Sequence, residues 1–492
     1  MHAYPIGHIY RHNSLVLGER VSRQIINTPE ASNVVHAARA LICSVWHQGK
    51  KEEQLKDARA SFLKARQGRP PRVAVSGFNM SINAAGRAYA LAEIYACSFD
   101  TTLIGFLHPR FGGELWAPLR SSPLPFQGIH IEHPTALPRE TMQFVLDNPF
   151  DIVHLSKPRF SNVLLGILYQ VIWGATVFMD VDDEDLGVLH ERQEPLSLDE
   201  FMATYPKRGR RWRKLLADEG TRVGVGLWDI FDGVTVSNPA LQKKYGGLIL
   251  PHARSAALFH PSQERKTAVR HEFDIPLDAT VFLFFGTARR HKGLLETAKA
   301  LGQCKDANTV YVIAGDIPDD SLQQELMSVT GAQIRILPNQ PYERVPDIVG
   351  MADACVLLQE EGSLLAQFQL PAKLIDALAM ELMVFLSPTP AVQNIIDAGA
   401  ALSVTPDTLV NEIEEFLSSL DHYADMRTKG RQLFLDYLSV EACTPLLLSF
   451  ISENTNAKVP QSPDRTDAAS GLIQGVGGWS EFSKNRLLRY IR

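Results

Sequence analysis

The stretch VFLFFGTARRHKGLLE, residues 281–296, joins an apolar strand, a glycine turn, a basic cluster and a helix start. A helix that begins directly after a strand offers free backbone N–H groups and the positive end of its dipole to an anion. Gly286 allows close approach of the backbone, and full charges follow it at Arg289, Arg290 and Lys292. The stretch therefore predicts a turn that binds a diphosphate.

A second segment, QLPAKLIDALAM at 369–380, predicts a helix with polar groups on one face. Lys373 and Asp376 are three residues apart, so their side chains are neighbours on that face. A carboxylate accepts hydrogen bonds from adjacent hydroxyl groups, which suits the ribose of a nucleotide. A surface Lys–Asp pair of little energetic weight is the alternative interpretation.

Strand and helix patterns alternate along most of the chain. Apolar runs typical of strands occur at 72–78, 101–107, 150–156, 233–237, 309–316, 334–339, 354–359 and 383–387. Such alternation implies parallel sheets with helices on both faces, and 492 residues suffice for two domains of this kind. We expect an α/β protein with a helical extension at 1–70, domains at 71–255 and 256–453, and a linker with a C-terminal helix at 454–492.

The longest apolar run, 163–179, is marginal in length for a membrane span. The run is interrupted by Gln170, Gly174 and Thr176. These residues favour a helix that ends at Trp173, a glycine stop, and a buried strand from Ala175 to Val181. The hydrophobic content of 45% and the charged content of 21% are those of an ordinary globular protein. A formal net charge of −6 argues against a general nucleic-acid binder.

The first twenty residues lack the apolar core of a signal peptide. The five cysteines are widely spaced, odd in number and without metal-ligand spacing, so a disulfide framework is not expected. These features predict a cytoplasmic protein. The one dense basic stretch, YPKRGRRWRKLL at 205–216, suggests peripheral contact with anionic lipid at the inner membrane face, although a solvated charged surface is the commoner explanation.

Together the two quoted segments resemble the donor-binding domain of family 4 glycosyltransferases, also called glycosyltransferase group 1. Lys292-Gly293 matches the family's diphosphate element, and Asp376 stands where the family has a ribose-binding glutamate. The resemblance implies the GT-B fold, in which two Rossmann-like doubly wound domains face each other across a cleft. It also implies a retaining enzyme that moves a sugar from a nucleotide-sugar to a carbohydrate or lipid-linked acceptor, without a metal or other cofactor.

The chain departs from the family pattern at the glycine turn. An arginine usually follows the glycine, whereas this chain has Thr287. We expect Arg289, or less readily Arg290, to take its place beside Lys292 and to stabilise the departing diphosphate.

The family's sugar-side glutamate is also displaced. It lies eight residues before the ribose acid, and that position is Phe368 here. Either Glu361, which precedes a glycine as in the family, reaches the sugar, or Gln367 and Gln369 contact it as neutral groups.

In the first domain, polar groups stand after strands at positions that would face the cleft. The loop 76–87 supplies Asn83, Gly86 and Arg87 as candidates for acceptor or phosphate binding, and His154 ends another strand. The acidic run 180–185 ends a third, and Asp180 is our candidate for orienting the acceptor hydroxyl or taking its proton. A core histidine, a metal site or a solvated acidic loop are the rival interpretations.

Two other function classes remain compatible with this pattern. The GT-B fold also hosts nucleotide-sugar epimerases, and fold alone does not fix function. A non-catalytic nucleotide-sugar or glycan binder that has lost the sugar-side glutamate is the other. The nucleobase, the sugar and the acceptor are not specified by these residues.

Overall fold

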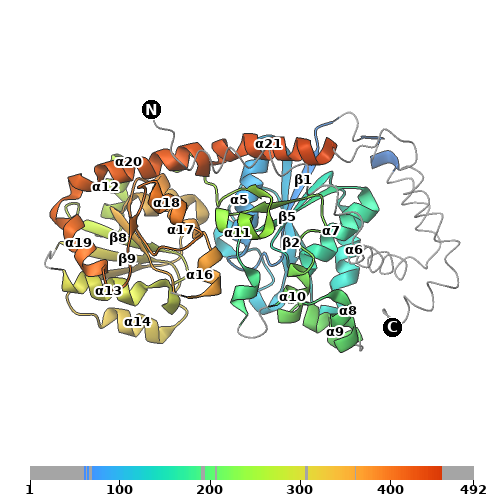
Figure 1. Ribbon diagram of the computed structural model, residues 1–492, viewed down its shortest axis with the longest axis horizontal. Coiled ribbons are helices and arrows are strands. Elements are labelled where there is room, and N and C mark those ends of the chain that lie inside the picture. Colours follow the sequence, from blue (N-terminus) through green and yellow to red (C-terminus); the bar gives the residue numbers. More distant parts are fainter. Residues whose placement is uncertain are drawn as a thin grey trace.

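The computed structural model describes residues 60–62, 64–65, 69–189, 194–205, 208–304, 308–360 and 362–456. Figure 1 shows two lobes side by side, each built around a sheet with helices packed on it. The expected α/β architecture of two doubly wound parallel sheets is confirmed.

The first sheet is parallel and has the order β3-β2-β1-β4-β5-β6-β7. Its strands are β1 (Arg72–Gly77), β2 (Asp100–Leu107), β3 (Phe126–His130), β4 (Ile152–Ser156), β5 (Thr176–Val181), β6 (Gly233–Val236) and β7 (Leu248–Ile249). The helices of this part are α5 (Ala85–Ala96), α6 (Leu137–Asp147), α7 (Phe160–Trp173), α8 (Leu198–Thr204), α9 (Arg208–Leu215), α10 (Asp218–Val225) and α11 (Pro239–Tyr245), with the short turn η5 (Asp185–Val188).

The second sheet is also parallel, in the order β10-β9-β8-β11-β12-β13. Its strands are β8 (Thr280–Phe285), β9 (Thr309–Ala314), β10 (Gln333–Leu337), β11 (Ala354–Leu357), β12 (Met383–Leu386) and β13 (Leu402–Ser403). Its helices are α12 (Gln263–Glu272), α13 (Leu294–Gln303), α14 (Asp320–Met327), α15 (Val345–Gly350), α16 (Leu364–Phe368), α17 (Ala372–Ala379), α18 (Gln393–Asp397), α19 (Leu409–Ser418) and α20 (Ala424–Leu433).

Alternate residues of the central strands enter different cores, because side chains of a strand point to opposite faces in turn. In β1, Val73 and Val75 pack with α5, whereas Ala74 packs with α6 and α7 on the other face. Both faces of the sheet are therefore buried, which explains why the strands read as continuous apolar runs.

The apolar run 163–181 folds as the sequence predicts. Helix α7 ends at Trp173, Gly174 adopts the left-handed conformation with φ 62°, and β5 follows. Such a glycine ends a helix without the steric cost that a Cβ would add. None of the described helices is both long and apolar enough to cross a membrane.

A single long helix links the two lobes at the end of the described chain. Helix α21 (Val440–Asn456) starts beside the second lobe and runs back over the first (Figure 1), where it packs on α5. Its Phe450 ring lies 4.9 Å from that of Phe178 in β5. The linker and C-terminal helix expected at 454–492 lie outside the described residues beyond Asn456, as does most of the helical extension expected at 1–70.

Candidate functional site

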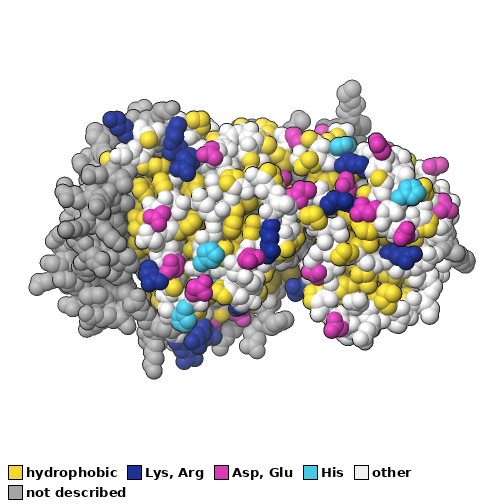
Figure 2. Space-filling model, turned by 180° about the vertical axis from the view of Figure 1, so that it is seen from behind, with side chains coloured by type: hydrophobic (Ala, Val, Ile, Leu, Met, Phe, Trp, Pro, Cys, Tyr) yellow, Lys and Arg dark blue, Asp and Glu magenta, His cyan; other side chains and the backbone are white. Residues whose placement is uncertain are grey.

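Each sheet reverses its strand order at one point, and ligands of open α/β sheets bind outside the carboxyl ends of the strands there. In the first sheet this point lies between β1 and β4, and in the second between β8 and β11. The surface is indented where the two lobes meet (Figure 2).

The turn after β8 is shaped by two glycines. Gly286 has φ 97° and Gly315, which follows β9, has φ 134°. A Cβ at Gly315 would lie 2.7 Å from the carbonyl oxygen of Gly286, closer than real Cβ contacts. The turn after β9 can approach Gly286 this closely because Gly315 lacks a side chain.

Three cations surround this turn. A Cβ built on Gly286 would lie 3.3 Å from Lys373 Nζ, and Lys292 Nζ donates to the carbonyl oxygen of Thr287 at 2.9 Å. Burial, followed by repulsion from Lys373 and Arg289, lowers the pKa of Lys292 to about 7. Neither Lys292 nor Arg289 forms an ion pair with any residue that the structure describes. An excess of positive charge, partly desolvated, is what an anionic ligand would neutralise.

Arg290 is not part of this group. Its guanidinium points to α14, where it pairs with Asp319 at 2.8 Å and with Glu325 at 2.7 Å. Arg289 is exposed and carries no such partner among the described residues, so the structure favours Arg289 over Arg290 beside Lys292.

The predicted ribose acid is engaged by another residue. Asp376 is 3% exposed, and its Oδ1 accepts a hydrogen bond from Arg254 Nε at 2.7 Å. Burial raises the pKa of Asp376, while the Arg254 charge opposes that rise. Arg254 lies 122 positions away in the chain, so no local pattern could have shown the pair. In this structure Arg254 therefore occupies the Oδ1 atom of Asp376.

The three residues considered for contact with the sugar differ in their positions. Glu361 lies outside the described residues. Gln367 is exposed on α16. Gln369 Nε2 donates to Asp183 Oδ1 of the first lobe at 3.1 Å, so it spans the two lobes in this structure.

Helix α16 as a whole docks on the first lobe. Asn238, which also caps α11, donates from Nδ2 to the carbonyl oxygen of Phe368 at 2.8 Å. A Cβ on Gly187 in η5 would lie 2.9 Å from the backbone nitrogen of Leu365. These contacts place the segment after β11 directly against the acidic run.

Arg87 and Asp180 form a buried ion pair with each other and do not face a cleft. Arg87 Nε and Nη2 donate to the two Asp180 oxygens at 2.8 and 2.6 Å, and both side chains are almost fully buried. Thr235 Oγ1 also donates to Asp180 Oδ1 at 2.7 Å. This arrangement argues against proton transfer by Asp180, because its oxygens are occupied and inaccessible.

His154 is a buried core residue. It is 0% exposed and lies 3.1 Å from the Tyr95 hydroxyl and 3.0 Å from Thr235 Oγ1. Burial, with a contribution from Arg87, lowers its pKa to about 3, so the ring is neutral. The expectation that it faces the cleft does not fit this position. Asn83 is exposed, and a Cβ built on Gly86 would have the Trp116 ring 3.8 Å away. Acceptor or phosphate binding by these two residues stays a prediction.

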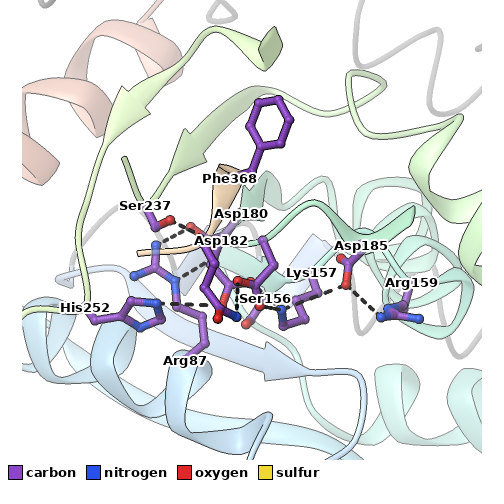
Figure 3. Close-up of polar contacts among 12 residues, drawn as sticks. Arg87, Ser156, Lys157, Arg159, Asp180, Asp182, Asp185, Ser237, His252 and Phe368 are labelled. Atoms are coloured by element: carbon purple, nitrogen blue, oxygen red, sulfur yellow. Dashed lines mark hydrogen bonds and ion pairs between the residues drawn. The ribbon is translucent and has the colours of Figure 1, made fainter. Parts of the chain in front are cut away.

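Lys157, which the sequence analysis missed, sits at the first switch point, directly after β4 (Figure 3). Its φ is 74°, a left-handed conformation that costs about 1–2 kcal/mol for a residue with a Cβ. Lys157 Nζ pairs with Asp182 Oδ1 at 2.8 Å and Asp183 Oδ2 at 2.6 Å. Burial alone would lower the pKa of Lys157, but the two carboxylates outweigh burial and raise this pKa.

Asp183 is the most exposed of the paired acids in this run, at 19% of its side chain. It is bound by Lys157 from one lobe and by Gln369 from the other. Positive φ in a lysine cannot be read from residue order, so only topology and backbone conformation reveal this site. No group of three or more His, Cys, Asp or Glu residues in the described chain could hold a metal ion.

The basic stretch 205–216 forms α9 and its flanks. Arg210 and Arg213 are exposed, whereas Trp212 packs against the core and Lys214 pairs with Glu219 at 2.8 Å. The aromatic ring therefore points into the protein rather than toward a membrane surface.

Residues 265–433 match the family model described as glycosyl transferases group 1. Two curated relatives are similar at 24% identity: the putative colanic acid biosynthesis glycosyl transferase WcaI of Escherichia coli K12 and the putative teichuronic acid biosynthesis glycosyltransferase TuaC of Bacillus subtilis 168. These matches span 32% and 37% of this chain, and only 40% and 43% of the relatives' own length.

Solved structures are similar over a longer range. Anabaena HepE in complex with UDP-glucose superposes with a TM-score of 0.59 at 14% identity, covering 78% of this chain and 99% of HepE. Sucrose-phosphate synthase of Thermosynechococcus elongatus gives 0.54 at 12% identity, covering 79% and 100%. At these identities the likeness shows the fold, which is GT-B, and the second lobe carries the group 1 glycosyl transferase pattern.

Proposed function

We propose that this chain is a retaining, metal-independent glycosyltransferase of family 4 type, which moves a sugar from a nucleotide-sugar to an acceptor hydroxyl. The observation that carries the proposal is the cluster of Lys292, Lys373 and Arg289 at the glycine turn after β8. A nucleotide-sugar presents a diphosphate that would neutralise this excess charge. The UDP-glucose complex of HepE and the group 1 match support the same ligand class.

In the proposed reaction, the bond from the sugar's anomeric carbon to the diphosphate oxygen breaks, and the acceptor oxygen bonds to that carbon. The electron pair of the broken bond goes to the diphosphate, and the acceptor proton leaves with it or to solvent. Lys292 and Arg289 stabilise the charge that grows on the leaving group, which lowers the barrier without a metal ion.

The acceptor is proposed to be a carbohydrate in cell-surface polysaccharide synthesis, because the two curated relatives are named for colanic acid and teichuronic acid biosynthesis. A lipid-linked acceptor would bring the chain to a membrane, where the exposed Arg210 and Arg213 offer positive charge. Liposomes test this contact: pelleting with anionic but not neutral vesicles at low salt supports it, and equal behaviour excludes it.

The first experiment measures thermal stability against UDP-, GDP-, ADP- and TDP-sugars and the free diphosphates. A ligand at a hundred times its dissociation constant stabilises the fold by about 2.7 kcal/mol, which gives a clear shift. We expect one nucleotide class to shift the wild type and Lys292→Ala to lose the shift. Lys299→Ala, an exposed lysine of α13, is the matched control and should keep it.

The same variants test catalysis once a donor is known. Lys292→Ala should lose at least about 10²-fold in rate, as expected for removal of one transition-state donor. Near-normal turnover of Lys292→Ala would refute its role, and no shift with any nucleotide would refute the proposed donor site.

A further inference from the structure

His252 lies on the segment that leads from the first lobe to the second, and its ring is almost buried without a hydrogen bond. The residue is 9% exposed. The backbone before it is fixed to the first lobe, because Arg87 donates to the carbonyl oxygens of Pro251 and Leu250 at 2.8 and 2.7 Å. Neither ring nitrogen bonds to a described residue. Buried polar groups normally have a partner, so this ring calls for an explanation.

The ring points to Asp182, which follows β5 (Figure 3). His252 Nε2 lies 4.0 Å from Asp182 Oδ2, which is too long for a hydrogen bond. Lys157 pairs with the other oxygen, Oδ1, at 2.8 Å. Neither ring nitrogen nor Oδ2 belongs to the described polar atoms that are sealed from solvent without a partner. Since these three atoms have no bond in the described chain, they border a space that solvent reaches.

This gap between His252 and Asp182 lies where the two lobes meet. The next acid of the run, Asp183, accepts a hydrogen bond from Gln369 of the second lobe at 3.1 Å. On the other side, Arg254 follows the ring by two positions and bonds to Asp376 of α17 at 2.7 Å. The gap is therefore at the carboxyl edge of the first sheet, between two contacts with the lobe that carries the cationic turn.

The charges around the ring keep it neutral. Burial, followed by the charge of Arg87, lowers the pKa of His252 well below its usual value. Arg254 and Lys157 act in the same direction, whereas Asp183 opposes them. A neutral imidazole has one N–H and one lone pair, so it can donate a single hydrogen bond toward Asp182 without forming an ion pair with it.

The distance across the gap selects what can fill it. One oxygen atom can lie about 2.8 Å from both Nε2 and Oδ2, which are 4.0 Å apart. A hydroxyl group there would donate to the Asp182 carboxylate and accept from the ring N–H. A phosphate or carboxylate oxygen only accepts, and it would face the charge of Asp182. The nearby cations offer it nothing, because Lys157 is bound by Asp182 and Asp183 and Arg87 by Asp180.

We propose that His252 and Asp182 hold the reacting hydroxyl group of the acceptor between them, and that the sugar bearing this hydroxyl is uncharged. The inference rests on the proposed function and deepens it by naming the charge class of the acceptor. Asp182 takes the orienting role that the sequence analysis gave to Asp180, and the segment between the lobes supplies the second contact.

The test measures transfer by the full chain from UDP-glucose, GDP-mannose, ADP-glucose and TDP-glucose to matched acceptors. The pairs are methyl glucoside with methyl glucuronide, and methyl galactoside with methyl galacturonide. The wild type should prefer the neutral member at least about tenfold in kcat/KM, because a carboxylate would meet like charge.

His252→Phe keeps a ring and removes both nitrogens. We expect it to lower kcat/KM for the neutral acceptor about tenfold, the equivalent of one hydrogen bond, and to leave donor affinity within about twofold. His252→Gln keeps a hydrogen-bonding group and should recover part of the loss. The glutamine variant also repeats the measurement if the phenylalanine variant is unstable.

Asp182→Asn removes the charge and keeps an oxygen that accepts, so it should narrow the preference for neutral over acidic acceptors. A merely structural role would lower both rates equally and leave their ratio unchanged. His271→Phe is the control, since His271 is exposed on α12, and it should change neither rate nor ratio.

Three results would overturn the inference while leaving the donor site in place. These are a wild type that prefers the acidic acceptors, a ratio that Asp182→Asn does not change, and donor binding without transfer to any member of the pairs. If no nucleotide-sugar shifts the thermal midpoint of the wild type, the proposed function fails and this inference with it.

Discussion

Lys292 is a cation held where its surroundings oppose ionisation. Burial, Lys373 and Arg289 together lower its pKa to about 7, against 10.5 for an ordinary lysine. A bound diphosphate would reverse this balance, because an opposite charge close by favours the ammonium form. The same residue is therefore unfavourable for the fold and favourable for the ligand, which is typical of functional sites.

This lysine predicts the pH dependence of binding. As pH rises above 7, the site loses the proton that the bound ligand needs, so affinity for a nucleotide-sugar should fall by up to about tenfold per pH unit until the bound-state pKa is reached. The diphosphate diester does not titrate there. Lys292→Arg keeps its charge throughout and should flatten the profile. Calorimetry between pH 6 and 9 measures this, and a flat wild-type profile would contradict it.

At the scale of elements, α16 is the piece of the second lobe that determines how it meets the first. It contacts η5 and α11, and Gln369 after it reaches Asp183. The fit is tight at Gly187, where a Cβ would lie 2.9 Å from the backbone nitrogen of Leu365. A backbone atom cannot swing away as a side-chain tip can, so one added methyl should separate the two elements.

We expect Gly187→Ala to lower the free energy of unfolding by about 1–3 kcal/mol, the usual cost of overpacking, and to loosen the contact between the lobes. Gly226→Ala is the control, since its Cβ would have 3.4 Å to the nearest atom. Thermal midpoints and the radius of gyration from small-angle scattering measure the two effects. If both variants behave alike, α16 does not dock as tightly as the geometry indicates.

Elements and turns were largely predictable because their causes are local. The glycine turn at Gly286 and the stop at Gly174 each depend on residues within a few positions. The side-chain pairings of the site could not be predicted from the sequence. Asp180 and Asp376 were recognised as polar groups in strategic places, but the arginines that bind them are 93 and 122 positions away.

At the scale of the whole molecule, hydrogen bonds join the two lobes outside α21. Ser121 Oγ donates to Glu343 at 2.8 Å, and Tyr342 OH donates to Glu93 Oε2 at 2.9 Å. Interfaces of this kind permit relative domain movement. Arg254 stands at the junction on Asp376, so a ribose that claims this carboxylate would release Arg254 beside Glu93. Under the proposed function, nucleotide binding and lobe arrangement would be connected through this guanidinium.

Glu93 offers a way to detect this interface in solution. Burial raises its pKa to about 7, opposed by Arg254 and the Tyr342 hydrogen bond and assisted by Asp376 and Glu441. An acid with a raised folded-state pKa contributes stability that is complete below its unfolded value, near 4.5, and is lost as pH rises through 7. Glu93→Gln does not titrate, and its amide oxygen still accepts the hydrogen bond from Tyr342. The stability of this variant relative to the wild type should therefore increase as pH rises from 4.5 to 7 and stay constant above pH 7. Thermal midpoints of both proteins from pH 4.5 to 8 give the difference. A difference that does not change with pH would show that Glu93 is hydrated, and that the lobes do not close over it as they do here.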